Sequence, residues 1–377
     1  MRLGYLLMAV LIVPSVAMAQ HRITFEPSLD LIEVQDNNLN FSEDAPLHDQ
    51  IRRATPELTL RFDSRRWSAR SIYSFDSERY ATHSNFDSAR ARQHAAIGIQ
   101  YRAGSRVLLL LDASSIRTNT LADLNTDTGL SGLRLRARRL NVTSSARYRI
   151  SPRWTVTASA GSTATTIVTG DASRTQVEAF AVEQRVNERN RLHLDYEHNM
   201  LTFSGETPQS LHSHVVLAGW TRDIGSQSSF SLRCGPRLSE GSLSMDVAAS
   251  LTHRWRATSI AISVLRNQTT VVGYAGAVDM ESAQVKFTYA PNRRFSAYAA
   301  PAIFQSASHG LDGTAYAAAA GARYAVTPLI GFDLAYNRVI QNGAIDPLRP
   351  DLKLSHATVS AGFSTHWNSD RYNRPMR

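Results

Sequence analysis

The sequence predicts an all-β protein, an antiparallel transmembrane β-barrel of about 18 strands with no plug domain. Two observations lead to this fold class: segments in which apolar and polar residues alternate recur from about residue 22 to residue 367, and they follow an export signal. A strand turns successive side chains to opposite faces, so each such segment has one apolar wall and one polar wall. This pattern is typical of outer-membrane barrels, which are apolar toward lipid and polar toward a lumen.

The alternation is clear in several segments. Residues 192–197 place Leu, Leu and Tyr on one side and His, Asp and Glu on the other, and residues 285–289 and 330–336 repeat the pattern. Hydrophobic residues make up 43% of the chain, a value that soluble proteins also have. The prediction of a barrel therefore rests on the periodicity of the sequence, and the composition is consistent with it.

The N-terminus has the three parts of an export signal. Arg2 is the positive start, residues 3–16 form an apolar run, and residues 17–19 (Ala-Met-Ala) are a small-x-small cleavage site. The alternative, a retained membrane anchor, is disfavoured because the run is shorter than the roughly 20 residues that a spanning helix needs. The expected domains are a signal peptide, the outer-membrane barrel and a basic C-terminal tail, over residues 1–19, 20–367 and 368–377.

The alternating segments give the expected strands in order. Each is bounded by residues of turn-forming type or by a break in the alternation. Sixteen strands is the alternative, if the first segment or the region 228–255 has been divided too finely. The expected strands are 22–34, 51–62, 67–77, 88–102, 106–117, 132–150, 154–166, 174–187, 191–203, 209–222, 228–238, 243–255, 257–270, 280–290, 295–306, 313–326, 329–340 and 354–367.

Connections between these segments alternate between tight and longer ones. Residues 63–66 and 103–105 are tight, whereas 35–50 and 341–353 are long. Outer-membrane barrels have short periplasmic turns and longer external loops, so the alternation predicts that both termini lie in the periplasm. The first strand starts within a few residues of the cleavage site, which leaves no room for an N-terminal plug.

Aromatic residues gather near the tight turns and predict a membrane-interface girdle. The alternative is the aromatic core of a soluble β-sandwich, which would seldom keep one period through so many hairpins. In the last strand, residues 359–367 carry apolar and aromatic side chains in one phase, and we expect barrel-insertion machinery to recognise them. The girdle residues are Phe62, Trp67, Tyr101, Tyr148, Trp154, Trp220, Trp255, Tyr289 and Phe295.

The phase opposite to the apolar one is rich in arginine. Arginine at the membrane midplane on the lipid face costs about 2–4 kcal/mol, so these side chains are expected to face water. Guanidinium groups make paired hydrogen bonds to carboxylate, phosphate and sulfate, which favours anionic solutes or anionic sugars. Genome composition is an alternative explanation, since Lys286 and Lys353 are the only lysines. The candidate lumen-lining residues are Arg61, Arg70, Arg90, Arg92, Arg102, Arg147, Arg149, Arg185, Arg254, Lys286 and Arg323.

Three further arginines, Arg134, Arg136 and Arg138, share one phase beyond the part of the strand that would span the membrane. We expect them in an external extension near lipopolysaccharide phosphates. Cys234 is in phase with Phe230 and Leu232, which predicts a lipid-facing position and no disulfide.

Enzyme motifs are sparse, and we expect no catalytic residues, no metal site and no cofactor. The sequence has no Gly-rich phosphate loop, no zinc-spaced Cys or His cluster and no Gly-x-Ser-x-Gly elbow. The groupings that could suggest a hydrolase are residues 212–214 (His-Ser-His) and the pair His193 and Asp195. The expected partners are membrane lipid, lipopolysaccharide and insertion machinery, with no nucleic acid.

The chain contains several distinctive strand and turn runs: residues 25–41 (FEPSLDLIEVQDNNLNF), 55–58 (TPEL), 73–80 (YSFDSERY), 89–94 (ARARQH), 215–222 (VVLAGWTR), 234–237 (CGPR) and 264–272 (VLRNQTTVV). These runs resemble a family of outer-membrane β-barrel porins, members of which occur in bacterial exopolysaccharide gene clusters. The resemblance covers nearly the whole mature chain and implies a barrel, an outer-membrane location and a role in passage of polysaccharide or small solutes. It carries over no catalytic residue, and fold does not fix function.

The sequence thus leaves two main functional hypotheses. The first is an outer-membrane channel that passes anionic solutes or exported polysaccharide. The second is a structural or assembly partner of a surface polysaccharide system that does not conduct, in which case inward loops or large side chains would close the lumen. An outer-membrane hydrolase is a minor third hypothesis, which would need a polar cluster on the outer wall or at the rim.

Overall fold

The computed structural model describes residues 22–130, 134–170, 172–204, 208–274, 276–308, 311–343 and 351–367. The expected signal peptide over 1–19 and the basic tail over 368–377 lie outside the described residues.

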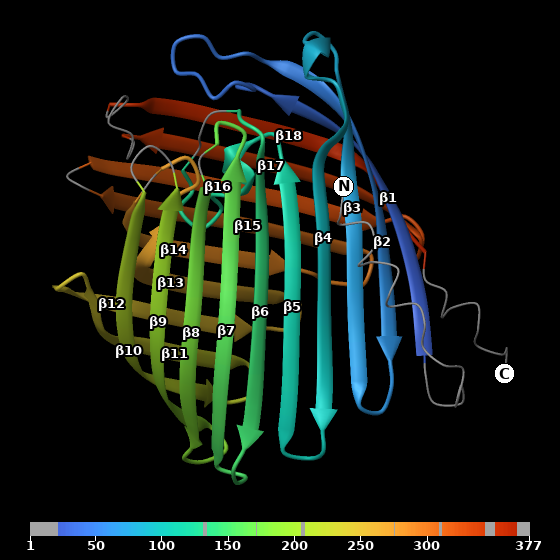
Figure 1. Cartoon of the computed structure of the whole chain (residues 1–377). Coiled ribbons are helices and arrows are strands. Elements are labelled where there is room, and N and C mark those ends of the chain that lie inside the picture. The colour runs from blue at the N-terminus through green and yellow to red at the C-terminus, as the bar shows by residue number, and fades with distance from the viewer. Residues whose placement is uncertain are drawn as a thin grey trace, which may run out of the picture.

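The described chain forms a single antiparallel sheet that closes on itself. Each strand pairs with its neighbours in sequence, and β1 also pairs with β18, which completes an 18-stranded barrel (Figure 1). The strands are β1 (Arg22–Asp36), β2 (Asp49–Asp63), β3 (Trp67–Tyr80), β4 (Ser88–Ala103), β5 (Val107–Thr118), β6 (Ala137–Arg149), β7 (Trp154–Ile167), β8 (Ala172–Arg185), β9 (Asn190–Ser204), β10 (Gln209–Ile224), β11 (Ser228–Ser239), β12 (Ser242–Arg254), β13 (Thr258–Thr270), β14 (Ala277–Tyr289), β15 (Phe295–Ser308), β16 (Leu311–Ala325), β17 (Ile330–Asn342) and β18 (Lys353–His366).

The expected strand count of 18 is confirmed, and the alternative of 16 is wrong. The first segment is a full strand, and the region 228–255 contains two strands, β11 and β12. The sixth expected strand, 132–150, was too long at its start, because β6 begins only at Ala137. Closure into one ring also excludes the soluble sandwich, since a sandwich needs two packed sheets.

The two ends of the barrel differ in their connections. Residues 64–66, 104–106 and 225–227 are tight turns at one end, which we call the turn end. The opposite end, the loop end, carries the longest connections, 37–48 and 119–136, although several connections there are also short. The start of β1 and the finish of β18 both lie at the turn end, because Arg22 pairs with Asp63 beside a turn and Ser28 pairs with His366.

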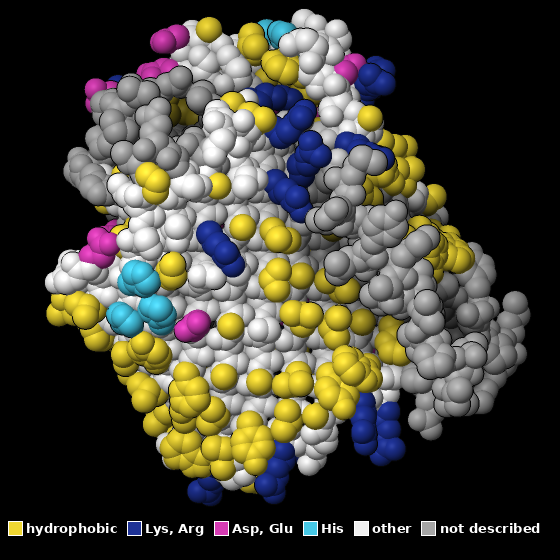
Figure 2. Space-filling view, viewed as in Figure 1, with side chains coloured by type: hydrophobic (Ala, Val, Ile, Leu, Met, Phe, Trp, Pro, Cys, Tyr) yellow, Lys and Arg dark blue, Asp and Glu magenta, His cyan; other side chains and the backbone are white. Residues whose placement is uncertain are grey.

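Alternate residues of every strand point outward, and we call them the outer series. Large apolar side chains of this series stay exposed: Leu194 is 55% and Phe363 54% exposed. Figure 2 shows such side chains as a broad yellow belt on the outer wall, nearer the turn end. A soluble protein would bury this surface, so its exposure fits a barrel surrounded by lipid.

Cys234 pairs with Ala218 and Val247 within this series and forms no disulfide.

The aromatic girdle residues lie at the turn end of the outer wall. Trp67 and Tyr101 stack with ring centroids 4.2 Å apart, and Tyr289 meets Phe295 edge-on at 6.4 Å. Trp255 remains 52% exposed. Amphipathic rings favour the membrane interface, so this girdle marks one membrane boundary.

The buried apolar residues lie inside the barrel, toward the loop end. One cluster joins Leu121 and Leu124 of the β5–β6 loop to Ala137 and Val272. A second joins Leu130 of the same loop to Val271 and Val278. The side chains of the alternate phase, which includes Val278 and Met280, therefore point into the lumen, and we call them the inner series.

Among the described residues, no helix is long and apolar enough to cross a membrane.

Candidate channel lumen

The arginine-rich phase belongs to the inner series. In β14, for example, the buried residues Val278, Met280 and Ser282 are followed in phase by Lys286. The same alternation places every candidate lumen-lining residue except Arg90 in the inner series: Arg61, Arg70, Arg92, Arg102, Arg147, Arg149, Arg185, Arg254, Lys286 and Arg323.

Arg90 is displaced by an irregularity in the β3–β4 ladder. Asp76 pairs with Arg92, but Glu78 pairs with Ser88, so β4 has extra residues between these pairs. The Arg90 guanidinium carbon then lies 5.9 Å from the centre of the Phe75 ring, which is next to Tyr73 in the outer series. A strict two-residue period cannot anticipate such a bulge.

The β5–β6 loop folds into the lumen and reaches the opposite wall. It contains a short 3-10 helix, η4 (Leu121–Asp123), and its Leu121 and Leu124 are buried. In the ring order, β5 and β6 are separated by about half the barrel from β13, β14 and β15, which the loop contacts. The loop is therefore a bridge across the lumen, and a constriction of this kind narrows the path of any solute.

Two contacts fix the far side of this bridge. The Asn125 side chain accepts a hydrogen bond from the backbone N–H of Val272 (2.8 Å) and donates one to the Val272 carbonyl (3.3 Å). Gly129, at φ +63°, is so close to the Phe304 ring of β15 that an added Cβ would lie 2.4 Å from it. Only glycine combines this backbone conformation with so close an approach.

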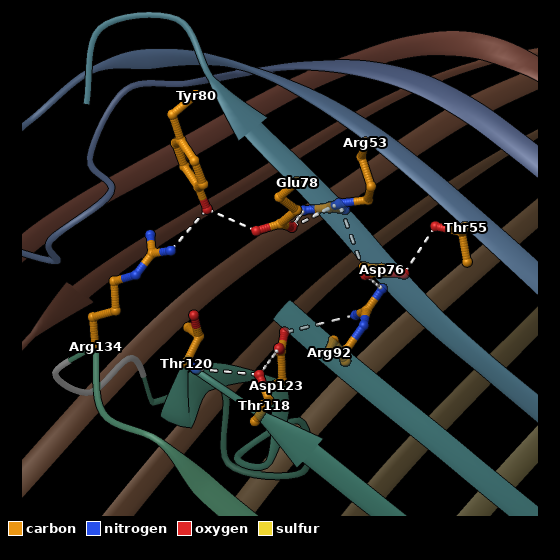
Figure 3. Close-up of polar contacts among 10 residues, drawn as sticks. All are labelled: Arg53, Thr55, Asp76, Glu78, Tyr80, Arg92, Thr118, Thr120, Asp123 and Arg134. Atoms are coloured by element: carbon orange, nitrogen blue, oxygen red, sulfur yellow. Dashed lines mark hydrogen bonds and ion pairs between the residues drawn. The ribbon is translucent and has the colours of Figure 1, made fainter. Parts of the chain in front are cut away.

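A ladder of charged side chains lines the inner wall of β2 and β3 beside the bridge (Figure 3). Arg53 makes two bonds to one carboxylate oxygen of Glu78, at 2.7 and 2.9 Å, and lies 3.8 Å from Asp76. Asp76 also accepts a hydrogen bond from the Thr55 hydroxyl at 2.8 Å. The carboxylate side chains of Asp76 and Glu78 are only 5% and 8% exposed, so Arg53 neutralises two nearly buried charges.

The ladder continues from β4 to the bridge. Arg92 bonds Asp76 at 2.9 Å and lies 3.8 Å from Asp123 of η4. The Thr118 hydroxyl donates to Asp123, which fixes that carboxylate at the start of the bridge. The bridge is thus tied electrostatically to the wall from which it departs.

Arg134 completes the ladder, contrary to expectation. The sequence predicted Arg134 in an external extension near lipopolysaccharide phosphates, but its guanidinium turns inward and donates to the Tyr80 hydroxyl at 2.7 Å. Tyr80 in turn donates to Glu78 at 2.7 Å. The Arg134 guanidinium carbon also lies 4.5 Å from the centre of the Phe86 ring. Together these contacts desolvate the charge and hold the end of the loop against β3.

The short β3–β4 connection is bonded in place. The Asp49 carboxylate accepts from the backbone N–H groups of Thr82 and His83. Two hydrogen bonds lower the pKa of the Asp87 carboxyl below its usual value. The larger effect comes from the backbone N–H of Tyr80 and the smaller from the Arg79 guanidinium. This bonding positions Phe86 beneath Arg134.

The two halves of the lumen differ in charge balance. Near the bridge, Arg53, Arg92 and Arg134 are matched with carboxylates or with a tyrosine hydroxyl, around a cavity of about 280 Å³. Toward the turn end, most inner-series cations have no ion pair among the described residues; these are Arg70, Arg102, Arg147, Arg149, Arg185, Arg254 and Lys286, of which Arg149 donates to the Ser105 carbonyl.

The outer wall carries a histidine cluster that the sequence did not predict. His198 stacks on His214 with ring centroids 4.8 Å apart, and His214 shares a 2.9 Å hydrogen bond with the Tyr196 hydroxyl. Ser213, between His212 and His214 in sequence, is 1% exposed and belongs to the inner series. The sequence grouping His-Ser-His is therefore divided between two faces and does not pair a histidine with that hydroxyl. No group of three or more metal-ligating side chains among the described residues could hold a metal ion.

The acidic residues of the ladder (Asp76, Glu78 and Asp123) and the anchor Asn125 were not predicted from the sequence. A signal was present, because residues 76, 78 and 80 (Asp, Glu, Tyr) repeat at the strand period on the inner phase. Asn125 lies in a loop, and the sequence gives no indication of the distant backbone that it bonds.

Comparison with known proteins identifies structural relatives only. OccAB4 from Acinetobacter baumannii superposes with a TM-score of 0.52 at 8% identity, over 93% of this chain and 99% of that chain. OccK7 (OpdD) from Pseudomonas aeruginosa superposes with a TM-score of 0.50 at 12% identity, over 93% and 100%. No family model and no curated protein matches the sequence. The superpositions show that the chain has a porin-like outer-membrane β-barrel fold.

Proposed function

We propose that the protein is an outer-membrane channel for small solutes, with a preference for anions. The observation that carries the proposal is the inner series itself, which holds charged side chains along a lumen inside an apolar outer wall. Charged side chains are stable at that depth only where water reaches them, so the lumen is hydrated.

The unpaired cations toward the turn end are the reason for the anion preference. Arg102, Arg147 and Lys286, for example, have no carboxylate partner among the described residues, whereas Arg53 and Arg92 at the bridge do. Rings of Arg and Lys side chains attract anions into a pore. The bridge in the lumen favours small solutes over a polymer, although the resemblance to porins of exopolysaccharide gene clusters keeps exported polysaccharide as a second solute class.

The proposal includes an orientation. Short turns are typical of the periplasmic end of such barrels, so both chain ends would be periplasmic and the bridge would enter from outside. Recognition of β18 by barrel-insertion machinery and contact with outer-membrane lipid belong to the same proposal.

One observation favours a second function, a structural or assembly partner that does not conduct. The β5–β6 loop reaches the opposite wall of the lumen and is bonded on both sides. If the loop leaves no continuous path, the barrel would serve as an anchor for a surface polysaccharide system.

Displacing the bridge distinguishes the two functions. Gly129→Val would drive a side chain into the Phe304 ring and lift the loop from the far wall, so single-channel conductance in planar bilayers is expected to rise above that of the wild type. Gly104→Val is the matched control, because Gly104 also has positive φ (+89°) but no atom within 4 Å of an added Cβ.

The conductances of the wild type and of Gly129→Val together distinguish the two functions. A conducting wild type with larger currents in Gly129→Val supports the channel. A silent wild type with a conducting Gly129→Val supports the closed, structural barrel. Silence in both proteins, with correct folding, would rule out a channel that this loop constricts.

A further inference from the structure

Two arginines face each other directly on the outer wall of the barrel. Arg117 of β5 pairs with Arg138 of β6 across the ladder, and both side chains are exposed. Their sequence neighbours Ile116 and Ala137 pack inside the barrel against Leu121, so the two arginines belong to the outer series. We call Arg117 and Arg138 the arginine pair.

Among the residues that the structure describes, no carboxylate forms an ion pair with Arg117 or Arg138. On the far side of Arg117 the ladder places Gln93, and on the far side of Arg138 it places Thr166. Like charges directly opposite each other in a sheet are destabilising, so a bound anion would stabilise this pair.

A second outer-wall pair shows the contrast. Arg52 of β2 and Arg79 of β3 also face each other, but Glu33 lies opposite Arg52 and the Asp87 carboxylate bonds Arg79 at 2.9 Å. In the described part of the chain, acidic side chains therefore accompany Arg52 and Arg79 but not Arg117 and Arg138.

The arginine pair lies just beyond the apolar belt, toward the loop end. On the same strands Leu111 and Leu140 follow in the outer series on the turn-end side. Arg136 and Arg174 are exposed nearby on this wall, and Figure 2 shows the basic side chains as a dark blue group above the yellow belt. This is the height at which lipid head groups would surround a membrane barrel.

We propose that the arginine pair binds phosphate groups of the membrane lipid that surrounds the loop end of the barrel. Two adjacent guanidinium groups present several N–H donors to one phosphate, and the apolar belt below receives the acyl chains of the same lipid. The proposal depends on the barrel lying in a membrane but not on its conducting ions.

Measuring lipid binding in detergent micelles tests whether the arginine pair binds lipid phosphate. The purified barrel is refolded in a nonionic detergent and titrated with diphosphorylated lipid A or with the same lipid after phosphatase treatment, and native mass spectrometry counts the bound lipids. The wild type is expected to bind the phosphorylated lipid and to lose binding of it in high salt. Arg117→Gln/Arg138→Gln is expected to bind it about tenfold more weakly.

Arg52→Gln/Arg79→Gln is the control, since it removes the same charge from the same wall, and its affinity should stay within about threefold of the wild type. Equal binding of both lipids by the wild type would overturn the proposal whatever the variants do. Equal loss in both variants would also overturn it, because binding would then follow net charge alone. Single-channel recordings of the same preparations keep this result separate from the channel proposal.

Discussion

Replacing Val285 with arginine is expected to destabilise the barrel by about 2–4 kcal/mol, because the new charge would face the lipid. Val285 pairs with Ile262 in the outer series of β13 and β14. Lys286→Glu, one residue away in the inner series, should leave folding intact and shift any ion selectivity toward cations. Heat-modifiable gel migration after refolding into detergent measures the first effect, and the reversal potential in a salt gradient measures the second.

Each variant is the control for the other, because the two substituted residues are adjacent in the sequence. A two-residue period between lipid and water is the arrangement in which adjacent residues behave so differently. Normal folding of Val285→Arg together with misfolding of Lys286→Glu would mean that the two faces of β14 are exchanged.

Replacing Arg53 with methionine should lower the free energy of unfolding by about 3 kcal/mol, since it leaves the buried Glu78 carboxylate without its cation. Glu78 would lose both of its bonds to Arg53, while Asp76 would keep Arg92. Urea unfolding in detergent micelles, followed by tryptophan fluorescence, measures the change.

Arg61→Met is the matched control. Its ion pair with Glu26, at 3.1 Å, involves an Arg61 side chain that is 45% exposed, so the cost should stay below about 1 kcal/mol. Arg53→Met/Glu78→Met should recover part of the lost stability, because it removes the orphaned charge as well. A loss no larger than that of Arg61→Met would show that the ladder is hydrated and contributes little to stability.

The strands could be predicted because a barrel repeats one local rule. Every spanning segment must alternate with period two, and β14 shows this within a few residues, from Val285 to Tyr289. Tight turns such as 104–106 then fix which segments are neighbours. The inner phase of the cationic side chains follows from the same rule, which fails at Arg90 because a bulge adds residues to β4.

The bridge could not be predicted, because its contacts are between distant parts of the chain. Asn125 bonds the backbone of Val272, which is 147 residues away in the sequence. A periodic sequence pattern predicts strands, but it does not predict whether a loop folds into the lumen. The expected external position of Arg134 was wrong for the same reason: Tyr80 and Phe86, which hold it, lie on a different hairpin. Side-chain partners of this kind are set by tertiary packing.

The reversal potential of the wild-type protein in a KCl gradient across a planar bilayer tests the central claim most directly. A hydrated lumen with unpaired cations toward the turn end predicts measurable current and a reversal potential of the sign that chloride preference gives, reduced by Lys286→Glu. A cation-selective current, or no current from the wild type after verified folding, would contradict it.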